Sequence, residues 1–159
     1  MDLDQAFHLK RRGGGFRLHY AIADPSAFVT PGGAIDREAH RRAETAYSPD
    51  ARTPLYPPAI SEAAASLLPD GPRPAALWCV DVDADGLPVD AQVERALVSS
   101  RAKLGYAETQ AAIDRGTADP MLELLPKIGS TLQEAERARG GPASACPLRR
   151  SSRAPAASA

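Results

Sequence analysis

Two carboxylates stand near the start of the chain, and their spacing could support metal chemistry. Asp2 and Asp4 flank Leu3, and residues 3–9 alternate between apolar and polar types, as in a half-buried strand. Residues i and i+2 of a strand project from one face, about 7 Å apart, and paired carboxylates suit Mg²⁺. Two carboxylates are too few for two-metal phosphodiester hydrolysis. By itself, Asp-x-Asp is more often a solvated chain end with incidental acids.

A second group of residues surrounds a proline-rich loop and could bind a nucleic acid. Tyr47 and Tyr56 lie close in sequence to Arg41, Arg42 and Arg52. Aromatic rings can stack on bases while guanidinium groups hold phosphates, a combination typical of single-strand binding. A helix end with an exposed polar face, next to a tyrosine that anchors the loop, explains the same residues. The residue types alone favour this second interpretation.

The segment Asp81-Val-Asp-Ala-Asp-Gly86 matches the first six positions of a calcium-binding EF-hand loop. However, Gln92 occupies the position of the bidentate Glu, and Pro88 follows the glycine. An alternating, strand-like run also precedes the segment where a helix is required. We therefore interpret the segment as the polar turn of a β-hairpin.

Alternating patterns predict two β-hairpins. The first joins residues 3–9 to 16–22 through a glycine turn, and the second joins 75–83 to 89–98. Trp78 should share one side of its strand with Val80 and Val82.

The 3.6-residue patterns predict helices at four places. The predicted helices are 36–46, with Asp36 as N-cap, 61–68, 106–114, and 121–139, which Pro126 should kink or split. Residues 48–58 hold four prolines and should be an extended loop. These elements predict an α+β fold, with an antiparallel-rich mixed sheet and helices packed on it.

Composition limits the chain to one domain with a tail. The 159 residues are 43% hydrophobic but only 5% aromatic, so we expect a core of small side chains and a marginal fold. The net charge of −1 gives no polybasic signature. Residues 140–159 have no periodicity and should be disordered. No apolar run approaches the roughly 20 residues needed to cross a bilayer. Cys79 and Cys146 have no metal-like spacing, so we expect a reduced, cytoplasmic protein.

Several short motifs follow one another in a specific order. They are Asp2-Leu-Asp-Gln-Ala6, His19-Tyr-Ala-Ile-Ala-Asp-Pro-Ser-Ala-Phe-Val29, Pro31-Gly32, Asp36-Arg-Glu-Ala39 with Arg42, Tyr47-Ser-Pro49, Pro57-Pro58, and Ser99-Ser-Arg-Ala-Lys-Leu-Gly-Tyr106. Together they resemble the catalytic RNB domain of the ribonuclease II and ribonuclease R exoribonucleases. The resemblance covers residues 2 to about 115 and stays compatible through 139. We therefore expect a partial RNB domain over 1–139 and a tail over 140–159.

The resemblance implies a processive 3′→5′ exoribonuclease that acts on single-stranded RNA. Such enzymes use Mg²⁺ to hydrolyse the last phosphodiester and release nucleoside 5′-monophosphates. Asp2 and Asp4 match catalytic positions that hold metal or position the attacking water. Gln5 stands where many members have another Asp, so its amide oxygen would be a neutral third ligand. Tyr47 matches a tyrosine that stacks on the 3′-terminal base, with Arg42 and Arg52 beside it.

The chain also departs from the family pattern. The family has a further catalytic Asp upstream of the Asp2 position, and a catalytic Arg beyond residue 159. Its flanking cold-shock and S1 domains are absent from this sequence. We therefore expect the N-terminal part of an RNB domain, with little or no activity alone. The alternative is a non-catalytic RNA-binding or scaffold module that retains part of the fold. The sequence leaves the oligomeric state open.

Overall fold

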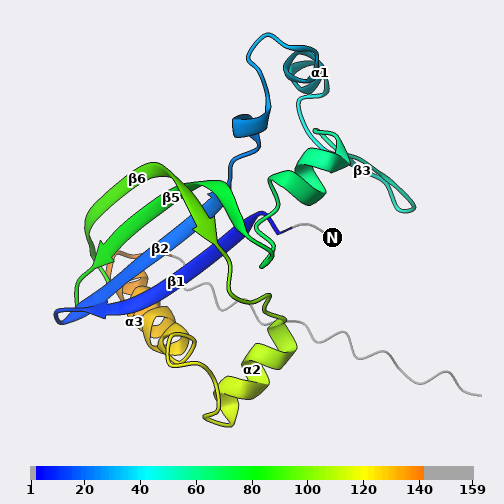
Figure 1. Ribbon diagram of the computed structural model, residues 1–159. Coiled ribbons are helices and arrows are strands. Elements are labelled where there is room, and N and C mark those ends of the chain that lie inside the picture. The colour runs from blue at the N-terminus through cyan, green and yellow to red at the C-terminus, as the bar shows by residue number, and fades with distance from the viewer. Residues whose placement is uncertain (1–2, 142–159) are drawn as a thin grey trace, which may run out of the picture.

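The protein is described here by a computed structural model that covers residues 3–141 and centres on a four-stranded sheet (Figure 1). The strands pair in the order β1-β2-β5-β6. They are β1 (Gln5–Arg12), β2 (Gly15–Ala23), β5 (Pro72–Val82) and β6 (Pro88–Ser99). Every pairing between described strands is antiparallel, so the sheet is not mixed over residues 3–141. The predicted α+β fold and both predicted hairpins are confirmed.

The strand register divides the sheet into two different faces, because directly opposed residues share a face. One face carries the row Phe7, Tyr20, Trp78 and Val93, which are neighbours across all four strands. The other face carries the buried core cluster. That cluster joins Ala21 and Ala75 of the sheet to Leu67, and Leu3, Ala6, Ala23, Leu77 and Val98 pack around it.

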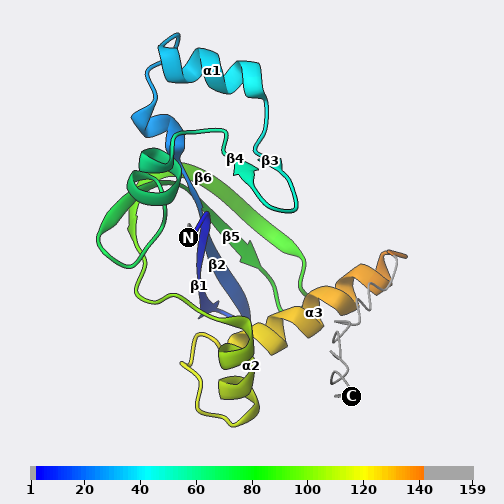
Figure 2. The same ribbon diagram turned by 90° about the vertical axis from the view of Figure 1, so that its right-hand side faces the viewer.

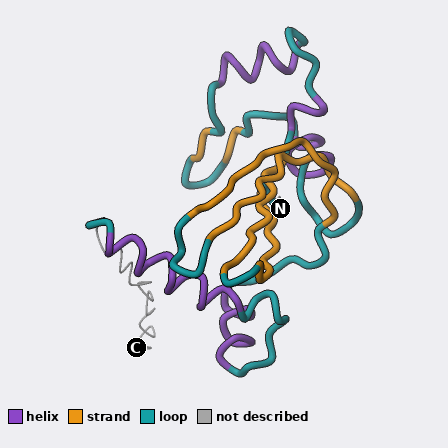
Figure 3. The backbone as a smooth tube through the Cα atoms, turned by 90° about the vertical axis from the view of Figure 1, so that its left-hand side faces the viewer, coloured by secondary structure: helices purple, strands orange, loops and turns teal. Residues whose placement is uncertain are grey.

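The chain between β2 and β5, residues 24–71, forms an arm at one end of the sheet (Figures 1 and 3). Its elements are η1 (Pro25–Phe28), α1 (Ala34–Arg42), β3 (Ala46–Tyr47), β4 (Arg52–Thr53) and η2 (Ala59–Ala64). Helices α2 (Tyr106–Asp114) and α3 (Leu124–Ala138) lie at the opposite end, near the hairpin turns (Figure 2). No helix within residues 3–141 is both long and apolar enough to cross a membrane.

Helix α1 differs from its prediction at both ends. It begins at Ala34, with Gly33 rather than Asp36 in the N-cap position. Asp36 lies in the first turn, where its carboxylate accepts a 2.8 Å hydrogen bond from the Gly32 N–H. The helix ends at Arg42 because Ala43 has a φ of 66°, outside the range of a right-handed helix. The residues predicted as its last turn therefore lead into the β3–β4 hairpin.

Two further helix predictions need correction. The predicted helix 61–68 lies two to four residues earlier, as η2, and it ends before Ser66 and Leu67 because these two residues bond to Leu3 instead. Pro126 does not split α3, since the helix begins at Leu124 and Pro126 lies in its first turn. A proline there loses no helical hydrogen bond. The predicted disordered tail lies, from residue 142 on, outside the described residues.

The acidic segment between β5 and β6 is a hairpin turn, as predicted. The Asp83 carboxylate accepts hydrogen bonds from the N–H groups of Asp85 and Leu87, at 3.0 and 2.9 Å. Asp81 is buried and receives two hydrogen bonds from the Arg17 guanidinium, at 2.6 and 2.7 Å. The Asp81 carboxylate therefore stabilises the sheet, and the Asp83 carboxylate stabilises the turn. The segment forms a hairpin turn rather than a calcium-binding loop.

Candidate functional site

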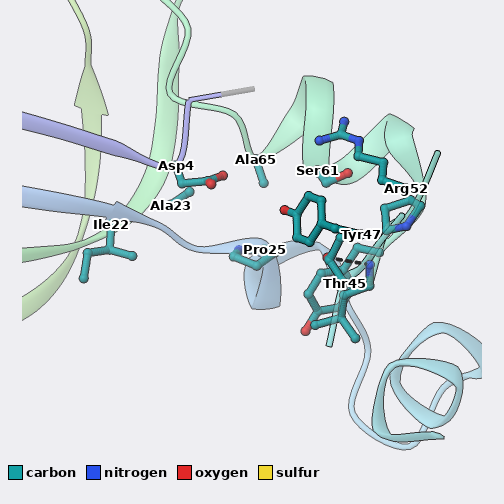
Figure 4. Close-up of a pocket in the computed structure, with 12 residues that line it drawn as sticks. Asp4, Ile22, Ala23, Pro25, Thr45, Tyr47, Arg52, Ser61 and Ala65 are labelled. Carbon is teal, nitrogen blue, oxygen red and sulfur yellow. Dashed lines mark hydrogen bonds between the residues drawn. The ribbon is translucent and has the colours of Figure 1, made fainter. Parts of the chain in front are cut away.

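A cavity of about 270 Å³ lies where the start of β1, the end of β2 and the arm meet (Figure 4). Its walls come from segments that are distant in the sequence. The lining residues are Asp4, Ile22, Ala23, Pro25, Thr45, Tyr47, Arg52, Pro54, Leu55, Tyr56, Ser61 and Ala65. Three of them, Asp4, Tyr47 and Arg52, are site residues predicted from the sequence. Folding thus brings a predicted metal ligand to the predicted RNA-binding residues.

Asp4 is held at the cavity by backbone bonds on both sides of its strand. The Asp4 carbonyl accepts a 2.9 Å hydrogen bond from the Ala23 N–H, which extends the β1–β2 ladder. On the other side, the Leu3 N–H donates to the Ser66 hydroxyl and the Leu3 carbonyl accepts from the Leu67 N–H, both at 2.8 Å. The Asp4 side chain remains exposed and points toward Ala65 (Figure 4). Its carboxylate is therefore available to a ligand.

Tyr47 and Arg52 are cross-strand partners in the β3–β4 hairpin. The Tyr47 side chain is 77% exposed, so most of its ring can meet a ligand. Arg52 forms an ion pair with Glu62 of η2, and this hydrogen bond lowers the pKa of Glu62. The hairpin thereby presents an aromatic ring and a guanidinium on the same wall of the cavity (Figure 4).

Arg42 does not line the cavity but braces its wall. Its guanidinium donates a 2.8 Å hydrogen bond to the Pro54 carbonyl and another of 2.8 Å to Glu38. Hydrogen bonds from Arg41 and Arg42 lower the pKa of Glu38 to about 2. Arg42 therefore connects α1 to a segment that lines the cavity. A direct contact between Arg42 and RNA stays a prediction.

Of the other two predicted metal ligands, the structure describes one. Asp2 lies outside the described residues, and Gln5 does not line the cavity. Gln5 follows Asp4 directly and pairs with Ile22 in the sheet. Because neighbouring side chains along a strand alternate, the Gln5 and Asp4 side chains point to opposite faces. Within residues 3–141, no group of three or more His, Cys, Asp or Glu side chains could hold a metal ion. Asp4 has oxygen chemistry that suits Mg²⁺, but the described residues do not complete a metal site.

Several residues of the cavity were not predicted from the sequence. Thr45 accepts a 3.1 Å hydrogen bond from the Leu55 N–H, which holds the two sides of the β3–β4 hairpin base together. Ser61 contributes a hydroxyl from η2. Neither has a distinctive sequence signal, because isolated hydroxyl residues in loops are common. Tyr56 belongs to the proline-rich loop and also lines the cavity.

Comparison with protein families gives one match over nearly the whole chain. The family model described as "RNB domain" matches residues 1–150. Exoribonuclease 2 of Photorhabdus laumondii is 37% identical over 136 residues, which cover 84% of this chain and 21% of that protein. Ribonuclease R of Acidithiobacillus ferrooxidans is 32% identical over 148 residues, covering 87% of this chain and 34% of that protein. The chain therefore spans only a fifth to a third of these relatives.

Solved structures share the same fold. Mycoplasma genitalium RNase R in complex with ribose-methylated single-stranded RNA aligns with a TM-score of 0.74 and 25% identity, covering 87% of this chain and 22% of that one. RNase R from the same organism was also solved in complex with double-stranded RNA, with the same TM-score and identity. Yeast Ssd1, described as a pseudonuclease, aligns with a TM-score of 0.70 at 20% identity, over 87% of this chain and 17% of that one. This last likeness concerns the fold alone.

Proposed function

Since the chain belongs to the RNB-domain family, we propose that its cavity binds the 3′ end of single-stranded RNA for Mg²⁺-dependent exonucleolytic hydrolysis. The observation that carries the proposal is the meeting of Asp4 with Tyr47 and Arg52 around one cavity. An exposed aromatic ring beside a guanidinium can hold a base and a phosphate. A carboxylate across from them would lie near the scissile bond.

Each residue has a distinct proposed role. The Tyr47 ring stacks on the terminal base. The Arg52 guanidinium releases Glu62 and contacts a backbone phosphate instead. Asp4, together with Asp2, supplies oxygen ligands. When bound there, Mg²⁺ would polarise the phosphodiester and activate a water molecule. The products would be nucleoside 5′-monophosphates released stepwise in the 3′→5′ direction.

A 5′-labelled oligoribonucleotide tests this proposal with separate binding and hydrolysis measurements. Tyr47→Ala should weaken binding by about 1–3 kcal/mol, the usual contribution of one stacked base. Asp4→Asn should retain binding and abolish any Mg²⁺-dependent shortening. Asp85→Asn is the matched control, because it neutralises an exposed carboxylate in the distant β5–β6 turn. Where the wild-type chain shortens the oligonucleotide measurably, equal effects of Asp4→Asn and Asp85→Asn on that shortening would contradict the role of Asp4.

We expect little hydrolysis from this chain by itself. Within residues 3–141 a single carboxylate, that of Asp4, lines the cavity, and no metal-binding cluster forms. Phosphodiester hydrolysis requires more charge stabilisation than one carboxylate can organise. Robust release of mononucleotides by the wild-type chain, lost in Asp4→Asn, would overturn this expectation.

The same observation favours a second candidate, a non-catalytic RNA-binding module. Tyr47 and Arg52 can bind RNA without a complete metal site. This candidate predicts binding that weakens as salt rises, with no shortening at any Mg²⁺ concentration. Undetectable binding at low salt would exclude it, whereas Mg²⁺-dependent shortening would favour the exoribonuclease.

A further inference from the structure

Two histidines face each other across the first pair of strands. His8 of β1 is directly opposite His19 of β2 in the antiparallel ladder. Their imidazole rings have centroids 5.9 Å apart and planes tilted by 44°. The two residues lie on the face that carries the core cluster, one step along the ladder from Ala6 and Ala21 on that face. The histidine pair is separate from the candidate site, because neither ring lines the cavity.

The separation of the two rings fits a metal ion held between them. A zinc ion lies about 2.0–2.1 Å from the imidazole nitrogen that binds it, and therefore roughly 3.2 Å from the ring centroid. Two imidazoles on one ion then have centroids about 5.2 Å apart at a tetrahedral angle, and about 6.4 Å apart when the ion and both nitrogens are in line. The observed 5.9 Å lies between these limits. The strand ladder therefore holds both rings at a distance that allows them to bind one ion.

The environment of His19 favours the form of the ring that binds metal ions. Burial lowers the pKa of His19 below its usual value, and the charge of Lys10 lowers it further. The neutral imidazole is therefore favoured, and this form has a free lone pair on one ring nitrogen. The Nδ1 atom of His19 is buried and has no hydrogen-bond partner within residues 3–141. No described group therefore competes with an ion for that nitrogen, and His8 is exposed to solvent, from which an ion would come.

The strand order explains why the histidine pair has no third protein ligand. Cys79 of β5 is directly opposite His19, on the side of β2 away from His8. The backbones of Cys79 and His8 are thus two strand spacings apart, about 9–10 Å, whereas a thiolate binds zinc at about 2.3 Å. This spacing agrees with the absence of a three-ligand group in the described part of the chain. Water molecules would complete the coordination of an ion at the pair.

Two basic side chains flank the pair and oppose the binding of a cation. Lys10 follows His8 by two residues on the same face of β1, and Arg17 has the same relation to His19 on β2. The Arg17 guanidinium donates two hydrogen bonds to the Asp81 carboxylate, at 2.6 and 2.7 Å, which offsets its charge. Lys10 therefore remains the main repelling charge, and its removal should tighten metal binding.

We propose that His8 and His19 form a binding site for a divalent transition-metal ion such as Zn²⁺, held by two imidazoles and water. Imidazole suits Zn²⁺, Ni²⁺ and Cu²⁺, whereas Mg²⁺ prefers oxygen ligands. The histidine pair therefore selects a different class of ion from the carboxylate of Asp4. The bound ion links β1 to β2 and stabilises the folded chain, because the unfolded chain does not hold the two rings together. The site is independent of the proposed RNA hydrolysis, in which neither histidine takes part.

Titration of the full chain with Zn²⁺ tests this site in a calorimeter, without RNA. The wild-type chain should bind one Zn²⁺ that excess Mg²⁺ does not displace, and its melting temperature should rise with the Zn²⁺ concentration. His8→Gln and His19→Gln should each weaken binding by about a hundredfold, the lower end of the gain from linking two binding groups. In NMR spectra of the wild type, the imidazole signals of both histidines should shift together as Zn²⁺ is added.

His40→Gln is the matched control. His40 is an exposed histidine of α1, and its Nδ1 atom lies 2.9 Å from the Asp36 carbonyl oxygen. This variant should bind Zn²⁺ like the wild type. His8→Gln should melt like the wild type when Zn²⁺ is absent, because the His8 side chain is exposed. Lost binding in His8→Gln is thereby separated from lost folding.

Two further variants test the surroundings of the pair. Lys10→Gln should tighten Zn²⁺ binding about threefold at low salt, because it removes a charge that repels the ion. Cys79→Ser should leave binding unchanged, since the thiol lies on the far side of His19 from the ion.

Three results would overturn the proposal. The first is the absence of Zn²⁺ binding, which would leave the pair as a cross-strand ring contact. The second is wild-type affinity in His8→Gln. The third is loss of binding in Cys79→Ser together with retained binding in His8→Gln, which would assign the ion to His19 and Cys79.

Discussion

The sheet and the arm are held together by different kinds of interaction. The four strands of the sheet form continuous antiparallel ladders, and the core cluster around Ala75 lies on one of its faces. Away from the buried residues 65–67 at its junction with the sheet, the arm depends mainly on separate polar bonds. The Thr45 hydroxyl accepts a hydrogen bond from the Leu55 N–H, and the Arg42 guanidinium donates one to the Pro54 carbonyl. Arg52 forms an ion pair with Glu62.

The stability of the fold and the geometry of the candidate site therefore depend on different regions of the chain. The sheet buries the core and carries Asp4 at its end, whereas the arm carries Tyr47 and Arg52. Elements with few buried contacts open at lower free energy than the core. We therefore expect the wall that would hold RNA to open at lower free energy than the sheet.

The largest effect is expected from a substitution at the junction between the sheet and the arm. Leu67 is 1% exposed and packs against Ala21 and Ala75 of the sheet. Leu67→Ala should lower the free energy of unfolding by about 3 kcal/mol, within the usual range for a buried leucine. The urea transition of the sheet should move to lower urea, because Leu67 packs on the sheet core.

The control for this change is Leu104→Ala, since Leu104 is 45% exposed. Its effect on the unfolding midpoint should be small. If Leu67→Ala loosened the arm but left the unfolding of the sheet unchanged, the junction would not belong to the core of both regions.

The same contrast explains how much the sequence could predict. Alternation located β1, β2, β5 and β6 because one-sided burial produces a period of two residues. Asp4 and Tyr47 could be selected because their residue types and order resemble a family. The end of α1 was missed, since it depends on the left-handed conformation of Ala43, an alanine that no local rule distinguishes.

The cavity itself could not be predicted from local patterns. Asp4 meets Tyr47 because the Leu3 backbone pairs with Leu67 and the hydroxyl of Ser66. Those partners are more than sixty residues apart, as in the Leu3–Ser66 bond with a separation of 63. Contacts of this kind depend on the folded chain as a whole. Sequence patterns describe only neighbours along one helix or strand.

A smaller change should affect the arm alone. In Thr45→Val the Leu55 N–H loses its acceptor, a bond that contributes about 1 kcal/mol. Amide exchange at Leu55 and its neighbours should accelerate, and RNA binding should weaken because Tyr47 lies on the same hairpin. The thermal transition of the sheet should change little.

Thr53→Val provides the control, because Thr53 is an exposed threonine of β4 in the same hairpin. It should retain both slow exchange at Leu55 and RNA binding. A large drop in the melting temperature of Thr45→Val would show instead that the arm and the sheet unfold as one unit.

The smallest expected effect belongs to the sheet and depends on pH. Burial lowers the pKa of His19 below its usual value of 6.5, and the charges of Lys10, His8 and Arg17 lower it further. The unfolded chain therefore binds a proton more readily than the folded one, so the free energy of unfolding should fall as pH drops below about 6.5.

His19→Gln should flatten this slope in thermal melts, whereas His40→Gln, on the exposed surface of α1, should preserve it. Because His19 lies on β2 and does not line the cavity, arm amide exchange should keep the same pH profile in both variants. A change in arm exchange with His19→Gln would show that the two regions are coupled through the sheet.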